Sequence, residues 1–313
     1  MEFNADYENA KKEILKKIEK EDNKKVVFQM YLSAGQFRND KDVVLAVIKK
    51  GMGLLLHVSE ELQKDKEVVL AAVKQDGHEL FYANKELQND KEVVLEAVKQ
   101  TGKSLLYASR ELQNDKDLVI LAIRNGLSLE NVLKKINKDF QNDKEVVLEA
   151  FKQDKTSFSL ASEELKNNKE VVLEAVKHDY RVIIEASKEL QNDKEVMLVV
   201  TKEGFPQSLF SIFFINPRLY DDKEFMLEMV KYNWISLEFA SKKLKNDKEI
   251  VFAAVKQNWM AVKYAGEELI NNESFLAILK KRLDTQTELY NDSEKSISTD
   301  DYNSGDNSGI GTM

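Results

Sequence analysis

The chain has 313 residues, of which 42% are hydrophobic and 33% are charged, with two prolines and no cysteine. The lack of cysteine excludes disulfides and thiolate metal sites, and the formal net charge of -8 argues against general nucleic-acid binding, which needs excess Lys and Arg. Apolar runs stay far below the roughly 18 residues of a membrane span, and the polar start resembles no signal peptide. We therefore expect no membrane span, no N-terminal signal peptide, and a location in the cytoplasm or, after secretion, in a host cell.

The first expected elements form an N-terminal cap over residues 1–38. Between residues 8 and 20, Ile14, Leu15 and Ile18 fall on one face of a helix while the remaining positions are mostly charged. Residues 22–37 look like a shortened and degenerate repeat. A polar outer face of this kind is typical of the terminal unit of a stacked-repeat protein.

From residue 39 the chain repeats one phrase, which reads Asn89-Asp-Lys-Glu-Val-Val-Leu-Glu-Ala-Val-Lys-Gln in one copy. Most copies start 25 residues after the previous one, and nine align when the Asp or Asn after the leading residue is taken as position zero. Position zero falls at Asp40, Asp65, Asp90, Asp115, Asp143, Asn168, Asp193, Asp222 and Asp247. A fixed period of this length indicates small helical units that bury their apolar faces only against their neighbours.

The phrase itself predicts one helix of about ten residues in each repeat. Asp or Asn at position zero is the expected N-cap, position two is always acidic, and position nine is always basic, which suits the helix dipole. Positions three, four, five, seven and eight are apolar and form a wide stripe. This principal helix is therefore expected to pack on both neighbouring repeats.

A turn and a second, shorter helix are expected to complete each repeat. Glycine at turns such as Gly77, Gly102 and Gly126 is expected to take the left-handed conformation that ends a helix. In the segment that follows, Leu105 and Leu112 fall seven residues apart and lie on one helical face with a small alanine between them. The sequence thus predicts an all-α fold, an α-solenoid of about nine 25-residue helical hairpins in a right-handed superhelix over residues 39–283.

The C-terminal end is expected to contain one more helix and then a disordered tail. Residues 271–283 read as a last principal helix that caps the solenoid. From residue 284 to residue 313 there are seven acidic residues against one Lys, and few large apolar side chains. Such a composition is typical of disorder, and the tail also resembles the C-terminal secretion signals of bacterial effectors.

The repeated phrase, followed by Gly, Leu, Tyr-Ala-Ser and Glu-Leu-Gln-Asn-Asp, resembles the helical-repeat family known as domain of unknown function 4116. The resemblance covers about residues 39 to 270 and rests on tandem recurrence of the phrase. Departures are Lys64, which replaces the leading Asn, and two repeats that are longer than the rest. The resemblance implies an all-helical repeat and no catalytic residues.

No catalytic or metal-binding pattern is apparent in the sequence. The three histidines, His57, His78 and His178, occupy different positions of their repeats, and no ligand spacing, phosphate-binding loop or nucleophile motif occurs. The acidic residues recur at one helical position, which explains them as capping residues. We expect no enzyme activity, no cofactor and no metal, although a cryptic pair of carboxylates is an alternative that the sequence leaves open.

Candidate partner-binding residues lie where the repeats depart from the consensus. Position twelve carries a large aromatic residue in four successive repeats, namely Tyr180, Phe205, Trp234 and Trp259. Aromatic residues dominate binding hot spots, but each ring could instead cover the end of a neighbouring helix. One of the two overlong repeats adds Phe210, Phe213 and Phe214, which could bind a partner or fill the core.

Taken together, these patterns favour a monomeric, non-enzymatic scaffold that binds a protein partner. The scaffold is expected not to bind nucleic acid. A secreted bacterial effector is one form of this role. The alternatives are an effector enzyme with a cryptic carboxylate site and a purely structural spacer.

Overall fold

The computed structural model describes residues 2–204 and 215–281, and every regular element in these ranges is helical. The chain divides into two compact units, Met1–Ser187 and Lys188–Met313. The prediction of an all-α repeat fold is confirmed. The predicted tail, residues 284–313, lies outside the described residues.

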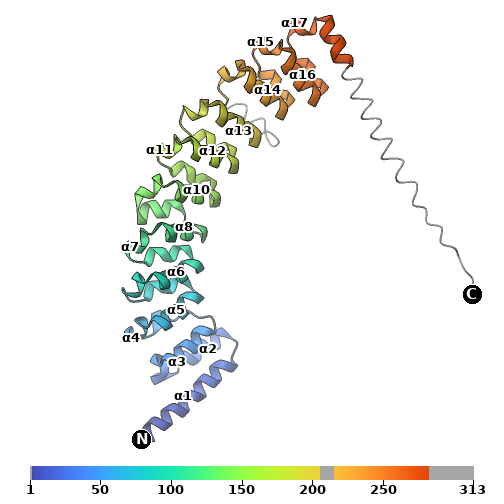
Figure 1. Ribbon diagram of the computed structural model, residues 1–313. Coiled ribbons are helices and arrows are strands. Elements are labelled where there is room, and N and C mark those ends of the chain that lie inside the picture. Colours follow the sequence, from blue (N-terminus) through green and yellow to red (C-terminus); the bar gives the residue numbers. More distant parts are fainter. Residues whose placement is uncertain (1, 205–214, 282–313) are drawn as a thin grey trace, which may run out of the picture. The chain divides into compact units, whose positions relative to one another are not determined.

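The first unit begins with the long helix α1 (Glu2–Lys20) and with α2 (Lys24–Leu32). One principal helix per repeat follows: α3 (Lys41–Lys49), α5 (Lys66–Gln75), α6 (Lys91–Gln100), α8 (Lys116–Arg124), α10 (Lys144–Gln153) and α12 (Lys169–His178). Figure 1 shows the principal helices from α5 to α12 stacked in one column. The short helices α4 (Glu60–Gln63), α7 (Arg110–Gln113) and α11 (Glu163–Lys166) lie in a second column beside it. The remaining short elements are η1 (Gly35–Asn39), η2 (Leu55–His57), η4 (Leu87–Asn89), α9 (Leu129–Asn131), η6 (Val132–Ile136) and η7 (Lys138–Asn142).

The second unit has the same repeat pattern. Its principal helices are α13 (Lys194–Gly204), α14 (Lys223–Tyr232) and α16 (Lys248–Gln257). Between them lie η10 (Leu190–Asn192), η12 (Pro217–Asp221), α15 (Lys242–Lys245) and α17 (Glu267–Ile270). A last helix runs over residues 273–281.

The predicted N-caps are confirmed in all nine repeats. Each side chain at position zero accepts a hydrogen bond from a backbone amide in the first turn of its helix. Asp90, for example, accepts from the amides of Glu92 and Val93 at 3.0 and 3.3 Å. Behind this cap, positions three, four, seven and eight of α6 are fully buried, while position five is only half-buried.

In six of the repeats the second helix differs from the prediction, because it is broken in the middle. The chain forms a six-residue 3-10 helix and then a short turn of helix. Between them Ala108 is extended, with φ -67° and ψ 166°. This kink frees the next amide, and Ser109 donates it to the carbonyl of Gln88 in the preceding repeat at 2.9 Å. The 3-10 helices are η3 (Gly77–Tyr82), η5 (Gly102–Tyr107), η8 (Lys155–Leu160), η9 (Tyr180–Glu185), η13 (Trp234–Phe239) and η14 (Trp259–Tyr264).

The role predicted for the turn glycines is correct at one position and wrong at two. Gly126 has a positive φ of 92°, as a helix-ending glycine should. Gly77 and Gly102 do not. At these two positions glycine is required by close approach, because a Cβ on Gly102 would lie 2.0 Å from the carbonyl oxygen of Ala122 in the next repeat. The principal helix ends instead at an extended residue, such as Asp76, whose side chain caps the following 3-10 helix.

Neighbouring repeats are joined by a ladder of ion pairs that starts from the Lys at position one. Lys66 lies 2.7 Å from the Asp90 carboxylate and 2.8 Å from that of Glu92, both in the next repeat. Lys223 makes the same pair of contacts with Asp247 and Glu249 in the second unit. The position-zero carboxylate therefore both caps its own helix and binds the preceding repeat. Sequence analysis assigned only the capping role, although the constant Lys was a visible signal.

Position fourteen places polar groups in the interior. Ser104, Ser157 and Ser236 are buried there, and their hydroxyl groups have no hydrogen-bond partner among the described residues. Glu79 occupies the same position and is 8% exposed. Its carboxylate accepts the Leu55 amide at 2.7 Å, and burial raises its pKa.

Replacing Ser236 with alanine is expected to stabilise the second unit by up to about 1 kcal/mol, because a buried hydroxyl without a partner costs free energy. Alanine already stands at this position in the next repeat, where Ala261 is fully buried. Urea unfolding of the purified chain would measure the change. A loss of stability would contradict the prediction and would indicate that the hydroxyl donates a hydrogen bond.

Candidate functional site

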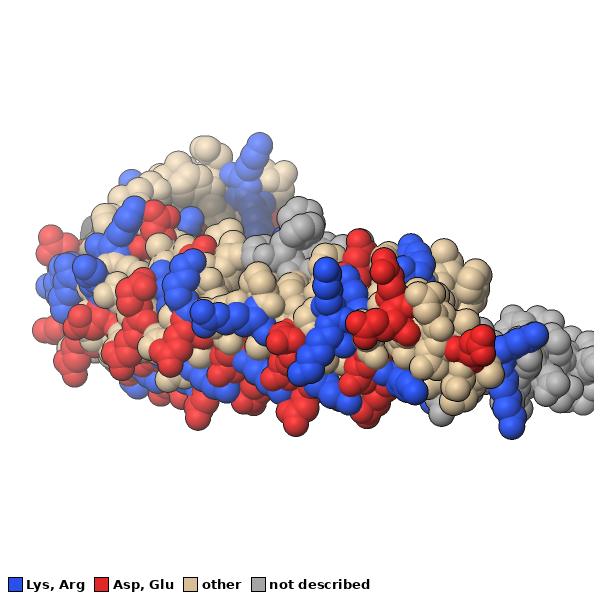
Figure 2. Space-filling model, turned by 90° about the horizontal axis from the view of Figure 1, so that it is seen from above, with Lys and Arg blue, Asp and Glu red and all other residues tan. Residues whose placement is uncertain are grey.

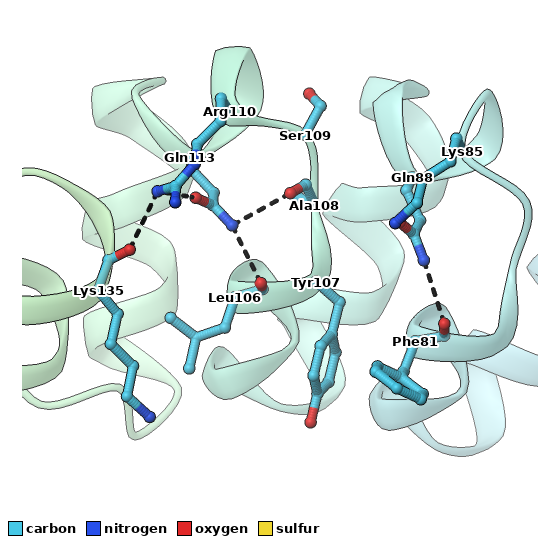
Figure 3. A pocket seen from close by; sticks show the side chains of 10 residues that line it. All are labelled: Phe81, Lys85, Gln88, Leu106, Tyr107, Ala108, Ser109, Arg110, Gln113 and Lys135. Atoms are coloured by element: carbon cyan, nitrogen blue, oxygen red, sulfur yellow. Dashed lines mark hydrogen bonds between the residues drawn. The ribbon is translucent and has the colours of Figure 1, made fainter.

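A cleft in the first unit is formed by the last residues of η3 and η5, the segments that follow these two helices, and one residue of η6. It has a volume of about 640 Å³. The side chains shown in Figure 3 line it: Phe81, Lys85, Gln88, Leu106, Tyr107, Ala108, Ser109, Arg110, Gln113 and Lys135. These residues come from three successive repeats, so stacking of the repeats creates the cleft.

The floor of the cleft is apolar and partly aromatic. Phe81 from η3 is 57% exposed although it packs edge-on against Tyr107 from η5, with ring centroids 5.2 Å apart. Leu106 is half-buried beside them. Contact of large apolar side chains with water is unfavourable. Covering them with a partner would therefore contribute favourable free energy to binding.

Two glutamines fix the backbone of the cleft walls. Gln113 Nε2 donates to the carbonyls of Leu106 and Ala108 at 3.0 and 3.1 Å. Gln88 makes the equivalent contacts one repeat earlier, donating to the carbonyls of Leu80, Phe81 and Ala83 at 3.0 to 3.1 Å. These side chains therefore occupy the carbonyl groups that the 3-10 helices leave unpaired.

Three basic residues at position twenty of successive repeats line the cleft, with Lys85 and Arg110 at its upper edge in Figure 3 and the Lys135 side chain pointing away from Arg110. Arg110 Nη1 donates to Gln113 Oε1 at 3.2 Å and to the Lys135 carbonyl at 3.1 Å, and Lys85 Nζ donates to Gln88 Oε1 at 2.9 Å. These partners are neutral. None of the three cations has a carboxylate within ion-pair distance in the described part of the chain, and no acidic residue lines the cleft.

Charges elsewhere on the molecule are mixed in sign. On the face shown in Figure 2, basic and acidic side chains lie interspersed and do not gather into a patch of one sign. The ladder explains much of this mixture, because most of the Lys residues at position one lie beside carboxylates of the next repeat. Close opposite charges cancel each other's field over a few ångströms. A convergence of unpaired cations over an apolar floor is therefore a distinct local feature.

Of the predicted partner-binding residues, Trp234 and Trp259 lie in the second unit and Tyr180 lies in the first. Phe205, Phe210, Phe213 and Phe214 lie outside the described residues. The predicted ridge of four aromatic corners therefore stays a prediction.

The two tryptophans differ in their surroundings. Trp234 packs against the next repeat, with its ring centroid 6.1 Å from that of Tyr264 and Lys263 Nζ 5.8 Å above it. This contact agrees with the alternative that a position-twelve ring covers the neighbouring repeat. Trp259, at the same position of the last aligned repeat, is 66% exposed.

Sequence analysis missed the cleft because no single residue in it is unusual. The available signal was positional: a cation at position twenty in three successive repeats, at Lys85, Arg110 and Lys135, with Phe81 and Leu106 at position sixteen. Elsewhere position twenty is acidic at Glu60 and Glu163 but basic again at Lys188 and Lys242, so a cation there is not by itself a sign of a cleft. Only the structure shows that both positions face the same space.

Within residues 2–204 and 215–281, no cluster of three or more His, Asp or Glu side chains is placed to hold a metal ion. No helix in the same ranges is both long enough and apolar enough to cross a lipid bilayer.

Comparison with known proteins identifies the class. The family designated domain of unknown function DUF4116 matches residues 40–88, 90–133, 128–166, 168–219 and 222–270. The chain therefore belongs to this family, in five tandem copies. Most copies span two of the structural repeats defined above. No curated protein and no solved structure gave a significant match to the chain.

Proposed function

We propose that the protein is a non-enzymatic helical-repeat scaffold whose first unit binds a protein partner at the cleft. The observation that carries this proposal is the aromatic floor, with Phe81 exposed and Tyr107 half-buried, beneath the guanidinium of Arg110, which has only neutral partners. Aromatic residues and arginine are the side chains that contribute most to binding hot spots.

The size and surroundings of the cleft support the same proposal. A volume of about 640 Å³ is within the usual range of binding clefts. Gln88 and Gln113 fix the backbone that carries the floor residues through their hydrogen bonds. Binding would therefore cost little conformational entropy of this backbone. A purely structural spacer has no need of exposed apolar side chains beside cations that lack a carboxylate partner.

The test is affinity capture with the full chain, comparing a cleft variant with a matched surface variant. The cleft variant combines Phe81→Ala with Arg110→Glu. The control combines Ile184→Ala with Lys103→Glu, because Ile184 is 54% exposed, Lys103 is exposed, and neither lines the cleft. Circular dichroism would establish that both variants are folded.

We expect that a protein captured by the wild-type chain is also captured by the control and is lost with the cleft variant. Equal capture by both variants would place binding elsewhere. Capture of nothing by any of them would favour the spacer. A role as a secreted effector, and the location in the cell, stay predictions from the sequence.

A further inference from the structure

We infer that the cleft takes an acidic peptide in the polyproline II conformation, with carboxylates on the cations of successive repeats and apolar side chains on the floor. This inference rests on the proposed function, because it names the chemistry of the partner that the cleft would bind. The residues that carry it are Lys85 and Arg110 at the upper edge, Phe81, Leu106 and Tyr107 below them, and Lys135 at one end of the cleft.

The charge of the partner follows from the hydrogen bonds of Arg110 and Lys85. Arg110 uses Nη1 for two neutral oxygens, so the donors on its other nitrogens are available to a ligand. Lys85 has one neutral partner for its three donors. A carboxylate supplies both the charge and the acceptors that these groups lack, and charge-assisted bonds of this type are stronger than neutral ones.

The conformation of the partner follows from the spacing of the cations and from the hydrogen bonds that the backbone carbonyls of the cleft already accept. The three cations are 25 residues apart in sequence, one per repeat, and packed helices lie about 8–10 Å apart. A polyproline II helix brings every third side chain to the same face after about 9 Å. It needs no backbone partners, whereas an added β-strand would need carbonyls that Gln88 and Gln113 already occupy.

A peptide fits these observations better than a nucleic acid. The floor includes Leu106, which offers no flat face for base stacking, and the chain as a whole has a formal net charge of -8. A short acidic peptide presents its few charges only to the cations of the cleft.

Fluorescence anisotropy of a labelled peptide with the repeated sequence Glu-Leu-Pro would test this inference with the full chain. We expect saturable binding that weakens as salt is added, because screening acts on exposed charges. Arg110→Gln should weaken binding about tenfold, as loss of a charge-assisted hydrogen bond does. Phe81→Ala should weaken it as well, while Lys103→Gln, outside the cleft, should leave it unchanged.

Three results would overturn the inference. They are absence of binding, equal binding of a matched Gln-Leu-Pro peptide, and equal binding by the Arg110→Gln variant. Competition by a uridine oligonucleotide at similar strength would also overturn it, in favour of nucleic acid. If the peptide fails while lysate capture still depends on Phe81 and Arg110, the proposed function stands and only the acidic chemistry is wrong. If capture fails too, both are wrong.

Discussion

Replacing Gly102 with alanine is expected to destabilise the first unit by about 3 kcal/mol, at the upper end of the usual cost of overpacking. The added Cβ would lie 2.0 Å from the carbonyl oxygen of Ala122, which is backbone and cannot rotate away. The Gly102 amide also donates to the carbonyl of Asn125 at 2.9 Å, so any shift that relieves the clash breaks a link between repeats. Urea unfolding, followed by hydrogen exchange in α6 and α8, would measure the loss.

Gly126→Ala is the matched control for this prediction. Gly126 has a φ of 92° and nothing within 4 Å of a built Cβ. Alanine there would suffer only the strain of the left-handed conformation, about 1–2 kcal/mol. If Gly126→Ala is the more damaging of the two, backbone conformation and not close approach governs these turns. The last two aligned repeats carry Trp234 and Trp259 at the position of Gly102, so the requirement for glycine is set by the particular neighbour and not by the repeat itself.

Acid is expected to destabilise the protein once the pH falls below about 4, because the unfolded chain then binds protons that the capping carboxylates of the folded chain bind only at lower pH. The hydrogen bond from Lys66 and those from the helix amides hold the pKa of Asp90 below its ordinary value. In the second unit Lys194 acts in the same way on the pKa of Asp222. At Asp65 and Asp115 partial burial opposes the shift, but the lysine and amide hydrogen bonds outweigh it and the pKa is again lowered.

The direction in which stability changes with pH follows from these lowered pKa values. A carboxyl whose pKa is lower in the folded state than its unfolded value of about 3.9 adds stability above that value. The added stability is lost as the pH falls through the folded pKa. Thermal melting between pH 7 and pH 2 would show the loss, and a melting temperature that stays constant down to pH 2 would contradict it.

Two substitutions of Asp90 separate its two roles at neutral pH. Asp90→Asn keeps the cap acceptor and removes the charge, so it should cost only about 0.5 kcal/mol. Asp90→Ala removes both, and should cost about 1.5 kcal/mol in total. Equal losses would mean that the ion pair with Lys66, and not the cap, accounts for the effect.

Glu79 is expected to change the pH dependence of stability in the opposite direction. Because burial raises its pKa, the stability associated with its neutral form is present below its unfolded value and is lost as the pH rises through the folded value. Glu79→Gln should therefore flatten the alkaline side of the stability profile and leave the acid side unchanged. The two kinds of carboxyl together predict greatest stability in mildly acidic solution.

Much of the fold could be predicted from the sequence because its signals are local. An N-cap such as Asp90 acts on amides two and three residues away, and the apolar stripe of α6 is visible within ten residues. The second helix was predicted wrongly because Leu105 and Leu112 satisfy helical spacing even though the chain is extended at Ala108. The competing hydrogen bond, from Ser109 to Gln88, belongs to another repeat and leaves no local trace.

The sequence by itself therefore determined the class of fold, the period of the repeats, and the start of every principal helix. The tertiary structure alone decided which repeats approach so closely that glycine is required, and which side chains meet across repeats. Phe81, Arg110 and Lys135 are ordinary residues at separations of about one repeat, and their convergence depends on the distance and rotation between stacked units. Local propensities act over a few residues, so they fix the helices but not the space between them.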